Sequence, residues 1–339
     1  MAVRTVRSSL VALVAVVLIE PSALAQEAKP PEPKPVPAMQ VIPLPYDQAS
    51  LESAGQELTR YHFGPGLVRP FWYPVAGPNG KALTRMGHPH DPHGHRHHYS
   101  VWISHEKVNE VNFWADGTGA RIVHQQVLQY EDGNDEASML SLNAWQDKEG
   151  KTLMLEHRRT AARMTQPDAA TPAAASTPKS VDWLMVIDLE LAAPGDRPVT
   201  LGQSPFGMIG VRMAKTIGVS DGGGRILNSA GQVNEVQVFR KPARWVDYSG
   251  PIAAGLSAGI ALMDHPSNPD HPTPFHVRDD GWMGASLTLN RPLEIRPGMP
   301  LRLRYGLWVH EGLPSVHEGE SAWARFAKLP PAPLSPAKK

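Results

Sequence analysis

The sequence of 339 residues contains no cysteine, so no disulfide stabilises the chain and its stability must come from a hydrophobic core. Its 33 basic and 33 acidic residues give a formal net charge of zero, which offers no electrostatic reason to expect nucleic acid or an anionic membrane as a partner. Beyond the N-terminus, the sequence lacks any apolar run long enough and free enough of charge to span a bilayer. We therefore expect the mature chain to be soluble.

The N-terminal residues 1–25 have the pattern of a secretory signal peptide. Arg4 and Arg7 precede an apolar run over Leu10–Ile19, and Ala23-Leu24-Ala25 is a small-x-small cleavage site. The apolar run is shorter than the roughly 20 residues that a spanning helix needs. We expect a secreted or periplasmic protein, with an uncleaved N-terminal anchor as the alternative.

The rest of the chain reads as one domain with flanking segments. Residues 26–45 are rich in Pro, Lys and Glu, a composition that predicts an extended linker unable to bury enough surface to fold. A single domain is expected over 46–328, followed by a disordered tail over 329–339. Within the domain, a low-complexity segment over 165–179 predicts a surface loop between two strands.

Alternation of apolar and polar residues dominates the domain. In Leu301–Val309 every second residue is apolar, which is typical of a strand with one buried face, and Val181–Leu189 repeats the pattern. One helix is predicted over Ser315–Lys328, before Pro330. The fold class predicted is all-β: a large antiparallel sandwich, similar to a supersandwich, with one C-terminal helix. Further strands are expected over Leu67–Val75, Lys81–Met86, His98–Ser104, Arg121–Tyr130, Met139–Gln146, Thr152–Ala162, Val233–Phe239 and Leu256–Met263.

Histidines gather in one segment, since Gly87–His98 holds six of the chain's 15. Imidazole is a common ligand of Zn, Cu, Fe and Ni and also the acid–base group that works near neutral pH, so either chemistry suits this segment. In the strand that follows, Val101 and Ile103 should face the core, while His98 and Trp102 share the other face and are the better candidates for a ligand cleft. The alternative is that the first three histidines of the segment are ordinary surface residues: His88, His90 and His93.

A second segment, Asp264–Arg278, follows an apolar strand and contains four prolines. Proline restricts the backbone, so we expect a rigid loop that preorganises its side chains. A purely structural crossing is the alternative.

Several motifs of aromatic, histidine and asparagine residues are spread along the domain. They are Arg69-Pro70-Phe71-Trp72-Tyr73-Pro74, His97-His98-x-x-Val101-Trp102-x-x-His105, Val108-Asn109-x-Val111-Asn112-Phe113-Trp114, Ser204-Pro205-Phe206-Gly207-Met208, Trp245-Val246-Asp247-Tyr248-Ser249-Gly250, and Asp264-His265-Pro266-x-Asn268-Pro269 through His276-x-Arg278. Through these motifs the chain resembles a bacterial domain-of-unknown-function family that carries the label "methane oxygenase PmoA". The resemblance covers residues from about Arg69 to Phe326 and implies a large β-sandwich similar to the galactose-mutarotase-like sugar enzymes. Methane oxidation is disfavoured, because membrane-embedded oxygenase subunits need spanning helices that the mature chain lacks.

The leading functional hypothesis is an exported carbohydrate-active protein. His97, His98 and His265 are the candidate proton-transfer residues, because no carboxylate pair is evident at either motif and epimerase, mutarotase or lyase chemistry then fits better than two-carboxylate hydrolysis. A carbohydrate or another small polar ligand is the expected partner. The candidate ligand-binding residues are Trp102, His105, Asn112, Trp114, Arg212, Asn268, His276 and Arg278.

Two other classes stay open at this point. A non-catalytic metal protein would hold Cu or Zn on imidazoles, and a plain sugar-binding module would merely line its pocket with histidines. The candidate metal ligands are His95, His97, His265 and His271. A composite catalytic site requires the two segments to meet, with His97 or His98 within about 10 Å of His265 so that they share a ligand or a water.

Overall fold

The computed structural model describes residues 1–2, 35–77, 80–87, 95–165 and 182–335. The chain divides into two compact units, Met1–Val36 and Pro37–Lys339, and the second of these contains all the strands and helices given below.

Several predictions from the sequence fall outside the described residues. These are the signal peptide over 1–25, apart from its first two residues, and the low-complexity segment over 165–179, apart from Thr165. His88, His90 and His93 also lie outside them.

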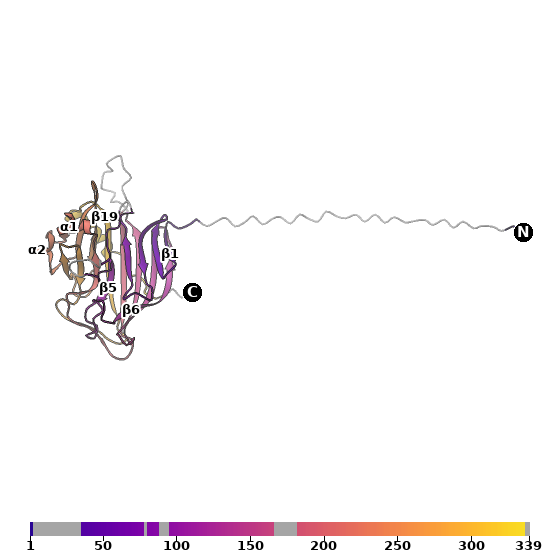
Figure 1. Ribbon diagram of the computed structural model, residues 1–339, viewed down its shortest axis with the longest axis horizontal. Helices are drawn as coiled ribbons and strands as arrows, with labels where there is room; N and C mark the ends of the chain where they lie inside the picture. Colours follow the sequence, from indigo (N-terminus) through magenta and orange to yellow (C-terminus); the bar gives the residue numbers. More distant parts are fainter. Residues whose placement is uncertain (3–34, 78–79, 88–94, 166–181, 336–339) are drawn as a thin grey trace. The chain divides into compact units, whose positions relative to one another are not determined.

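A nine-stranded antiparallel sheet forms the first layer (Figure 1), in the order β1-β2-β3-β4-β5-β11-β17-β16-β13. Its strands are β1 (Met39–Leu44), β2 (Gln48–Ser53), β3 (Gln56–His62), β4 (Phe71–Val75), β5 (Val101–His105), β11 (Gly207–Arg212), β17 (Trp282–Ser286), β16 (Pro274–Arg278) and β13 (Lys241–Pro242).

An eight-stranded antiparallel sheet forms the second layer, in the order β12-β14-β15-β19-β9-β8-β7-β6. Its strands are β12 (Arg225–Asn228), β14 (Trp245–Ala253), β15 (Leu256–Asp264), β19 (Leu301–Glu311), β9 (Trp183–Ala192), β8 (Thr152–Met164), β7 (Glu136–Gln146) and β6 (Arg121–Glu131). A separate two-stranded sheet pairs β10 (Val199–Leu201) with β18 (Leu293–Ile295).

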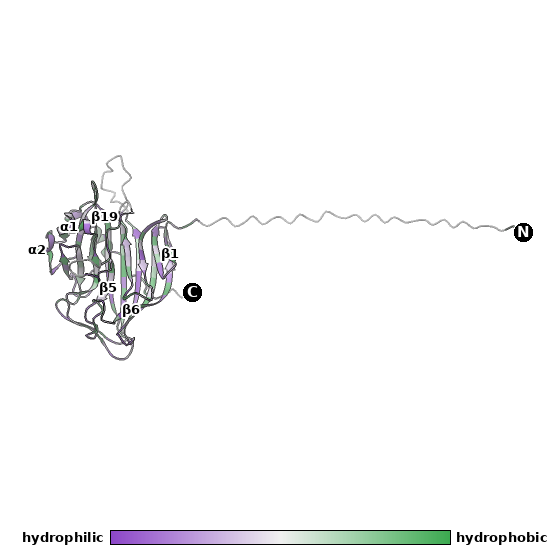
Figure 2. Cartoon of the chain, viewed as in Figure 1, coloured by the Kyte–Doolittle hydropathy of each residue, from purple (hydrophilic) through white to green (hydrophobic). Residues whose placement is uncertain are grey.

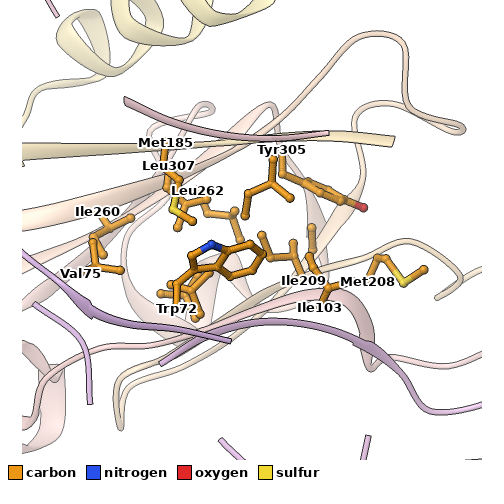
Figure 3. Packing of buried hydrophobic residues seen from close by; sticks show 14 of the residues in the cluster. Trp72, Val75, Ile103, Met185, Met208, Ile209, Ile260, Leu262, Tyr305 and Leu307 are labelled. Carbon is orange, nitrogen blue, oxygen red and sulfur yellow. The ribbon is translucent and has the colours of Figure 1, made fainter. Parts of the chain in front are cut away.

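The main core lies between the two large sheets, where alternate residues of each strand point inward. Figure 3 shows Trp72 and Ile103 of the nine-stranded sheet facing Leu262 and Tyr305 of the eight-stranded sheet, all of them fully buried. Burial of apolar surface on this scale is the main stabilising contribution to folding. Both hydrophobic and hydrophilic residues occur along the strands, as a sheet with one buried face requires (Figure 2). The all-β sandwich predicted from the sequence is confirmed.

Among the described residues, the helices are short except for the one near the C-terminus. Helix α3 (Val316–Ala327) begins with a capping box, in which the Ser315 side chain accepts from the backbone N–H of Glu318 and the Glu318 carboxylate accepts from the backbone N–H of Ser315. This confirms the predicted C-terminal helix. The other helical elements are η2 (Lys215–Ile217), α1 (Val219–Gly222) and α2 (Asn234–Val238), and α1 and α2 lie on the side of the sheets away from β1 (Figure 1).

The predicted end of the linker and the strand predicted over Val233–Phe239 are wrong. The folded unit begins before residue 46, because Met39–Leu44 pairs with β2 and buries Met39 and Val41. The segment Val233–Phe239 contains helix α2 rather than a strand. Its Glu235 forms hydrogen bonds with Asp279, in the turn between β16 and β17. The tail is anchored where it starts, since the Arg304 guanidinium donates to the carbonyls of Leu329 and Pro330 at 2.9 Å each.

In the described part of the chain, every helix is too short or too polar to cross a membrane.

Candidate functional site

A group of aromatic side chains packs on the outer face of the nine-stranded sheet, and we call it the aromatic cluster. In β5, Val101 and Ile103 point into the main core, so Trp102 points outward, as the alternation predicted. The ring centroids of Trp102 and Trp282 lie 5.3 Å apart, and Trp114 lies 5.3 Å from Trp102. The cluster consists of Phe71, Trp102, Trp114 and Trp282.

Two glycines make room for these indoles. A Cβ atom on Gly210 would lie 2.7 Å from a ring carbon of Trp282 and 2.8 Å from one of Trp102, and Gly284 meets the Trp282 ring in the same way. The indole rings therefore occupy the space that side chains at these two strand positions would need.

One imidazole, that of His98, stacks on this cluster, and the imidazoles of His95 and His97 contact it in turn. His98 lies 4.9 Å from Trp282 and 5.3 Å from Trp102, His95 lies parallel to His98 at 4.7 Å, and His97 meets His98 edge-on at 4.5 Å. Burial is the main cause that lowers the pKa of both His97 and His98, and for His98 the neighbouring cations lower it further. Both rings are therefore neutral at physiological pH, and the same burial makes them weak proton acceptors.

A buried arginine fixes the backbone that carries these imidazoles. The Arg69 guanidinium donates to the carbonyl of His97 at 3.1 Å, to the carbonyls of Phe113 and Trp114 at 2.9 Å each, and to the carboxylate of Asp116 at 3.1 Å. This arrangement holds the histidine segment and the Trp114 loop together.

His276 enters the same neighbourhood from β16, because that strand pairs directly with β17. Its ring stacks on Phe206 at 5.2 Å and lies 6.3 Å from Trp282. Burial first, and then the charge of Arg278, lowers the pKa of His276 to about 4. The residues His276 and Arg278 lie on a strand, so the rigid loop expected over Asp264–Arg278 ends at Thr273.

Beside these imidazoles is a pocket of about 460 Å³, which we call the Asp280 pocket. His95 belongs both to the pocket and to the stack on His98, so the two features adjoin. The pocket is lined by His95, Ser220, Glu235, Arg278, Asp279 and Asp280.

Ionic contacts hold the polar groups of the Asp280 pocket in place. Arg212, which is 1% exposed, donates to both oxygens of Asp280 at 2.8 and 3.2 Å. In the same pocket, the Arg278 guanidinium donates to Glu235 Oε1 at 2.5 Å and lies 4.5 Å from the centroid of the Phe239 ring. His95 Nδ1 lies 3.7 Å from Asp280 Oδ2, close enough for one imidazole and one carboxylate to act on the same ligand.

The α2 helix is tied to the β16–β17 hairpin by reciprocal bonds. The backbone N–H of Glu235 donates to Asp279 Oδ1 at 3.0 Å, and the backbone N–H of Asp279 donates to Glu235 Oε2 at 2.9 Å. The Tyr248 hydroxyl steadies the same hairpin, since it accepts from the N–H of Gly281 and donates to the carbonyl of Arg278. The carboxylates of the pocket are therefore preorganised.

Sequence reasoning identified His95, Arg212 and Arg278 but missed the three carboxylates of the pocket. Asp279 and Asp280 directly follow Arg278, and this run of charge at the end of a strand was the available signal. Nothing in the spacing connects Glu235 with that hairpin.

Some predicted ligand-binding residues have structural roles. His105 is fully buried and bonds Thr288 Oγ1 at 2.8 Å, and burial lowers its pKa to about 4. Asn112 caps its own loop by accepting from the backbone N–H groups of Trp114 and Ala115. Trp102 and Trp114 are 0% and 4% exposed, so they support the imidazoles instead of offering open faces to a sugar.

His265 lies elsewhere in the fold. It follows β15 of the eight-stranded sheet and meets Phe326 of α3 edge-on at 5.3 Å, in the outer cluster of that sheet. The main core separates this cluster from the one beneath His98. The expected site composed of His97 or His98 with His265 is therefore not formed, and from the second segment only the His276–Arg278 end reaches the histidines.

The buried Asp264 carboxylate explains the rest of that segment. It accepts from Asn268 at 2.7 Å, from the backbone N–H of Thr273 at 2.8 Å, and bonds His271 Nδ1 at 2.8 Å. Asn268 also bonds the backbone of Arg304 in both directions. The Asp-His-Pro segment is a structural crossing over the sheet, which is the alternative that the sequence left open.

The set His95, His97, His265 and His271 does not converge, because its first two members lie at the aromatic cluster and its last two lie beside α3. Among the described residues, no group of three or more His, Asp or Glu side chains has the arrangement of a metal site.

Comparison with known families identifies a match over most of the chain. The model of a family of unknown function, DUF6807, matches residues 48–324. A comparison with curated proteins finds no match.

Proposed function

The chain belongs to this family of unknown function, and we propose from the site itself that the protein is carbohydrate-active and moves protons on a sugar bound in the Asp280 pocket. One observation carries the proposal: three carboxylates, a guanidinium and an imidazole converge in a single pocket of about 460 Å³. Convergent polar groups of this kind bind ligands rich in hydroxyl groups, because each hydroxyl both donates and accepts.

Asp280, Glu235 and Arg278, whose positions are fixed by ion pairs, bind the ligand. The paired oxygens of Asp280 and Glu235 accept from sugar hydroxyls, and the planar fork of Arg278 donates to them. Because each charged group already has a partner, the pocket binds a polar ligand without reorganising its own side chains.

Proton transfer falls to His95. Its Nδ1 faces Asp280, and its ring stacks on the neutral His98, which in turn packs on the aromatic cluster. The separation of 3.7 Å between His95 Nδ1 and Asp280 Oδ2 exceeds a hydrogen bond, and such contacts tighten when a ligand closes the site. The carboxylate then orients the imidazole as base or acid.

Epimerisation, mutarotation or elimination fits this geometry better than hydrolysis by two carboxylates. Glu235 and Asp280 are both engaged by arginines, unlike the apolar setting that keeps the acid of a glycosidase protonated. The family resemblance described under Sequence analysis implies a sandwich similar to that of galactose-mutarotase-like sugar enzymes, which favours the same class of substrate.

The test uses untagged protein and a panel of monosaccharides and oligosaccharides, followed by NMR for anomeric exchange, epimerisation or cleavage. The expected result is turnover of at least one sugar, reduced about 100-fold in Asp280→Asn, since positioned acid–base groups contribute roughly that much. Asp270→Asn is the matched control, because Asp270 pairs with Arg291 at 2.8 Å on the exposed surface and lies outside the pocket. Sugar binding without turnover would favour a binding module, and no binding at all would refute the proposal.

Export is a second part of the proposal and is supported by the signal-peptide pattern of residues 1–25. Expression of the full chain in a Gram-negative host should yield periplasmic protein with a new N-terminus near Gln26. An intact N-terminus on protein that stays in the cytoplasm would contradict it.

A further inference from the structure

Helix α1 borders a second pocket as well as the Asp280 pocket. The second pocket has a volume of about 430 Å³, and its lining combines apolar residues at the end of β14 with polar residues of η2 and α1. We call it the Ile252 pocket. Its lining includes Lys215, Thr216, Asp221, Pro251, Ile252 and Ala253.

The two pockets are neighbours across α1. Ser220 lines the Asp280 pocket, and the next residue, Asp221, lines the Ile252 pocket. The backbone N–H of Ser220 donates to the carbonyl of Asp279 at 2.9 Å. A Cβ atom on Gly218 would lie 3.7 Å from Asp221 Cβ and also 3.7 Å from the carbonyl oxygen of Asp279. Lining residues of the two pockets therefore lie close together, and one ligand can reach both.

The wall that the pockets share is held in a fixed position. The Tyr248 hydroxyl accepts from the backbone N–H of Val219 in α1 at 3.1 Å and from that of Gly281 in the β16–β17 hairpin at 3.0 Å. The chain after α1 packs directly on β14, because a Cβ atom on Gly250 would lie 2.7 Å from Gly224 Cα. The arrangement of the two pockets is therefore set before a ligand binds.

The Ile252 pocket offers both an apolar surface and hydrogen-bonding groups. Ile252 is half-buried and packs against the main core, so its position is fixed. Lys215, Thr216 and Asp221 are exposed, which leaves their side chains available to a ligand. Ligand pockets typically combine an apolar lining with a few polar groups that orient the ligand. A sugar ring matches this lining, because its C–H groups are apolar and each of its hydroxyls donates and accepts.

We propose that the Ile252 pocket is a second subsite that binds the neighbouring residue of an oligosaccharide whose first residue occupies the Asp280 pocket. This inference rests on the proposed function, because it requires a sugar in the Asp280 pocket. Its support is that two adjoining pockets, of about 460 and about 430 Å³, lie on either side of one short wall.

The consequence is a preference for saccharides of at least two residues. A disaccharide that spans α1 gains contacts in both pockets but loses its translational and rotational freedom only once, so it should bind more tightly than its monosaccharide. A monosaccharide in the Asp280 pocket gains nothing from the second lining.

The test is isothermal titration calorimetry of the untagged full chain with matched probes. The monosaccharides are D-glucose, D-galactose, D-mannose and D-xylose, and each is compared with its own 1,4-linked disaccharides. We expect at least one disaccharide to bind about tenfold or more tightly than its monosaccharide, a difference of about 1.4 kcal/mol. Asp280→Asn should weaken the binding of both members of that pair.

Two variants test the second subsite itself. Asp221→Ala removes an exposed carboxylate of the Ile252 pocket, and Thr216→Val removes an exposed hydroxyl without changing the size of the side chain. Each should reduce the ratio of disaccharide to monosaccharide affinity by about threefold or more, since each removes one hydrogen-bonding group. Asp196→Ala is the matched control and should keep the ratio, because Asp196 is exposed and lies outside both pockets.

Two results would overturn this inference and leave the proposed function standing. One is a set of monosaccharides that bind as tightly as all of their disaccharides. The other is a disaccharide preference that both Asp221→Ala and Thr216→Val leave unchanged, because the Ile252 pocket would then take no part in binding. A failure of every probe to bind would refute the proposed function and this inference together.

Discussion

Replacing Gly210 by alanine should destabilise the protein from the middle of the nine-stranded sheet. The added Cβ would lie 2.7 Å from Trp282 and 2.8 Å from Trp102, whereas carbon atoms pack at about 3.5–4.0 Å. One indole must therefore move by about 1 Å within a cluster whose members are at most 6% exposed. Overpacking of this kind costs about 1–3 kcal/mol.

Part of that cost is offset in the unfolded state, because alanine has less backbone freedom than glycine by about 0.4–1 kcal/mol. Gly195→Ala measures this offset, since nothing lies within 4 Å of the Cβ at that exposed position. We therefore expect Gly210→Ala to be less stable than Gly195→Ala by about 1–3 kcal/mol in urea denaturation followed by tryptophan fluorescence.

Gly210→Ala should also displace His95 in the Asp280 pocket, because His98 stacks on both indoles and His95 stacks on His98. Sugar affinity at the Asp280 pocket should fall in Gly210→Ala and stay unchanged in Gly195→Ala. Equal stability of the two variants, within about 0.5 kcal/mol, would refute the packing that we describe.

Three further predictions concern other contacts. Arg212→Met should impair sugar turnover by freeing the Asp280 carboxylate, and a turnover rate equal to that of the wild type would show that the ion pair does not position it. Burial lowers the pKa of the fully buried His310, but the neighbouring Asp247 carboxylate outweighs burial and the pKa is raised overall. The stabilisation from this pair is therefore complete below about pH 6.5 and is lost as the pH rises through the raised pKa of His310. Urea denaturation across this range should show that loss in the wild type and a flatter profile in Asp247→Asn; a wild-type stability that rises with pH over the same interval would contradict the sign. Ser315→Ala should cost about 1 kcal/mol of stability by removing the cap of α3, and a change below about 0.3 kcal/mol in thermal melts would refute the capping role.

Several strands could be predicted because apolar and polar residues alternate along them, whereas β11 and β17 are buried on both faces and were not predicted. Leu301–Val309 alternates clearly, and β19 occupies Leu301–Glu311. Met39–Leu44 was predicted as linker because residues 26–45 as a whole are rich in Pro, Lys and Glu. Pairing with β2 and a bond from the N–H of Val41 to Asp132 hold it in the sheet. Tertiary pairing overrode local composition there.

The site was predictable only in part, because its residues come from strands that are distant in sequence and become neighbours only in the folded sheet. The β16–β17 pairing brings His276 beside Trp282, and this neighbour relation follows from topology that no local pattern encodes. His265 belongs to the same sequence segment as His276, but it follows β15 of the eight-stranded sheet, whereas His276 lies on β16 of the nine-stranded sheet. Chemical type alone could not distinguish the two histidines.

The most direct test of the proposed chemistry is proton NMR of wild type and Asp280→Asn with the best-bound sugar in D₂O. We expect the wild type to exchange anomers or to incorporate deuterium at a ring carbon, with the variant slower by roughly 100-fold and folded to the same melting temperature. Equal rates in the two proteins would contradict a role for the His95–Asp280 pair in moving protons.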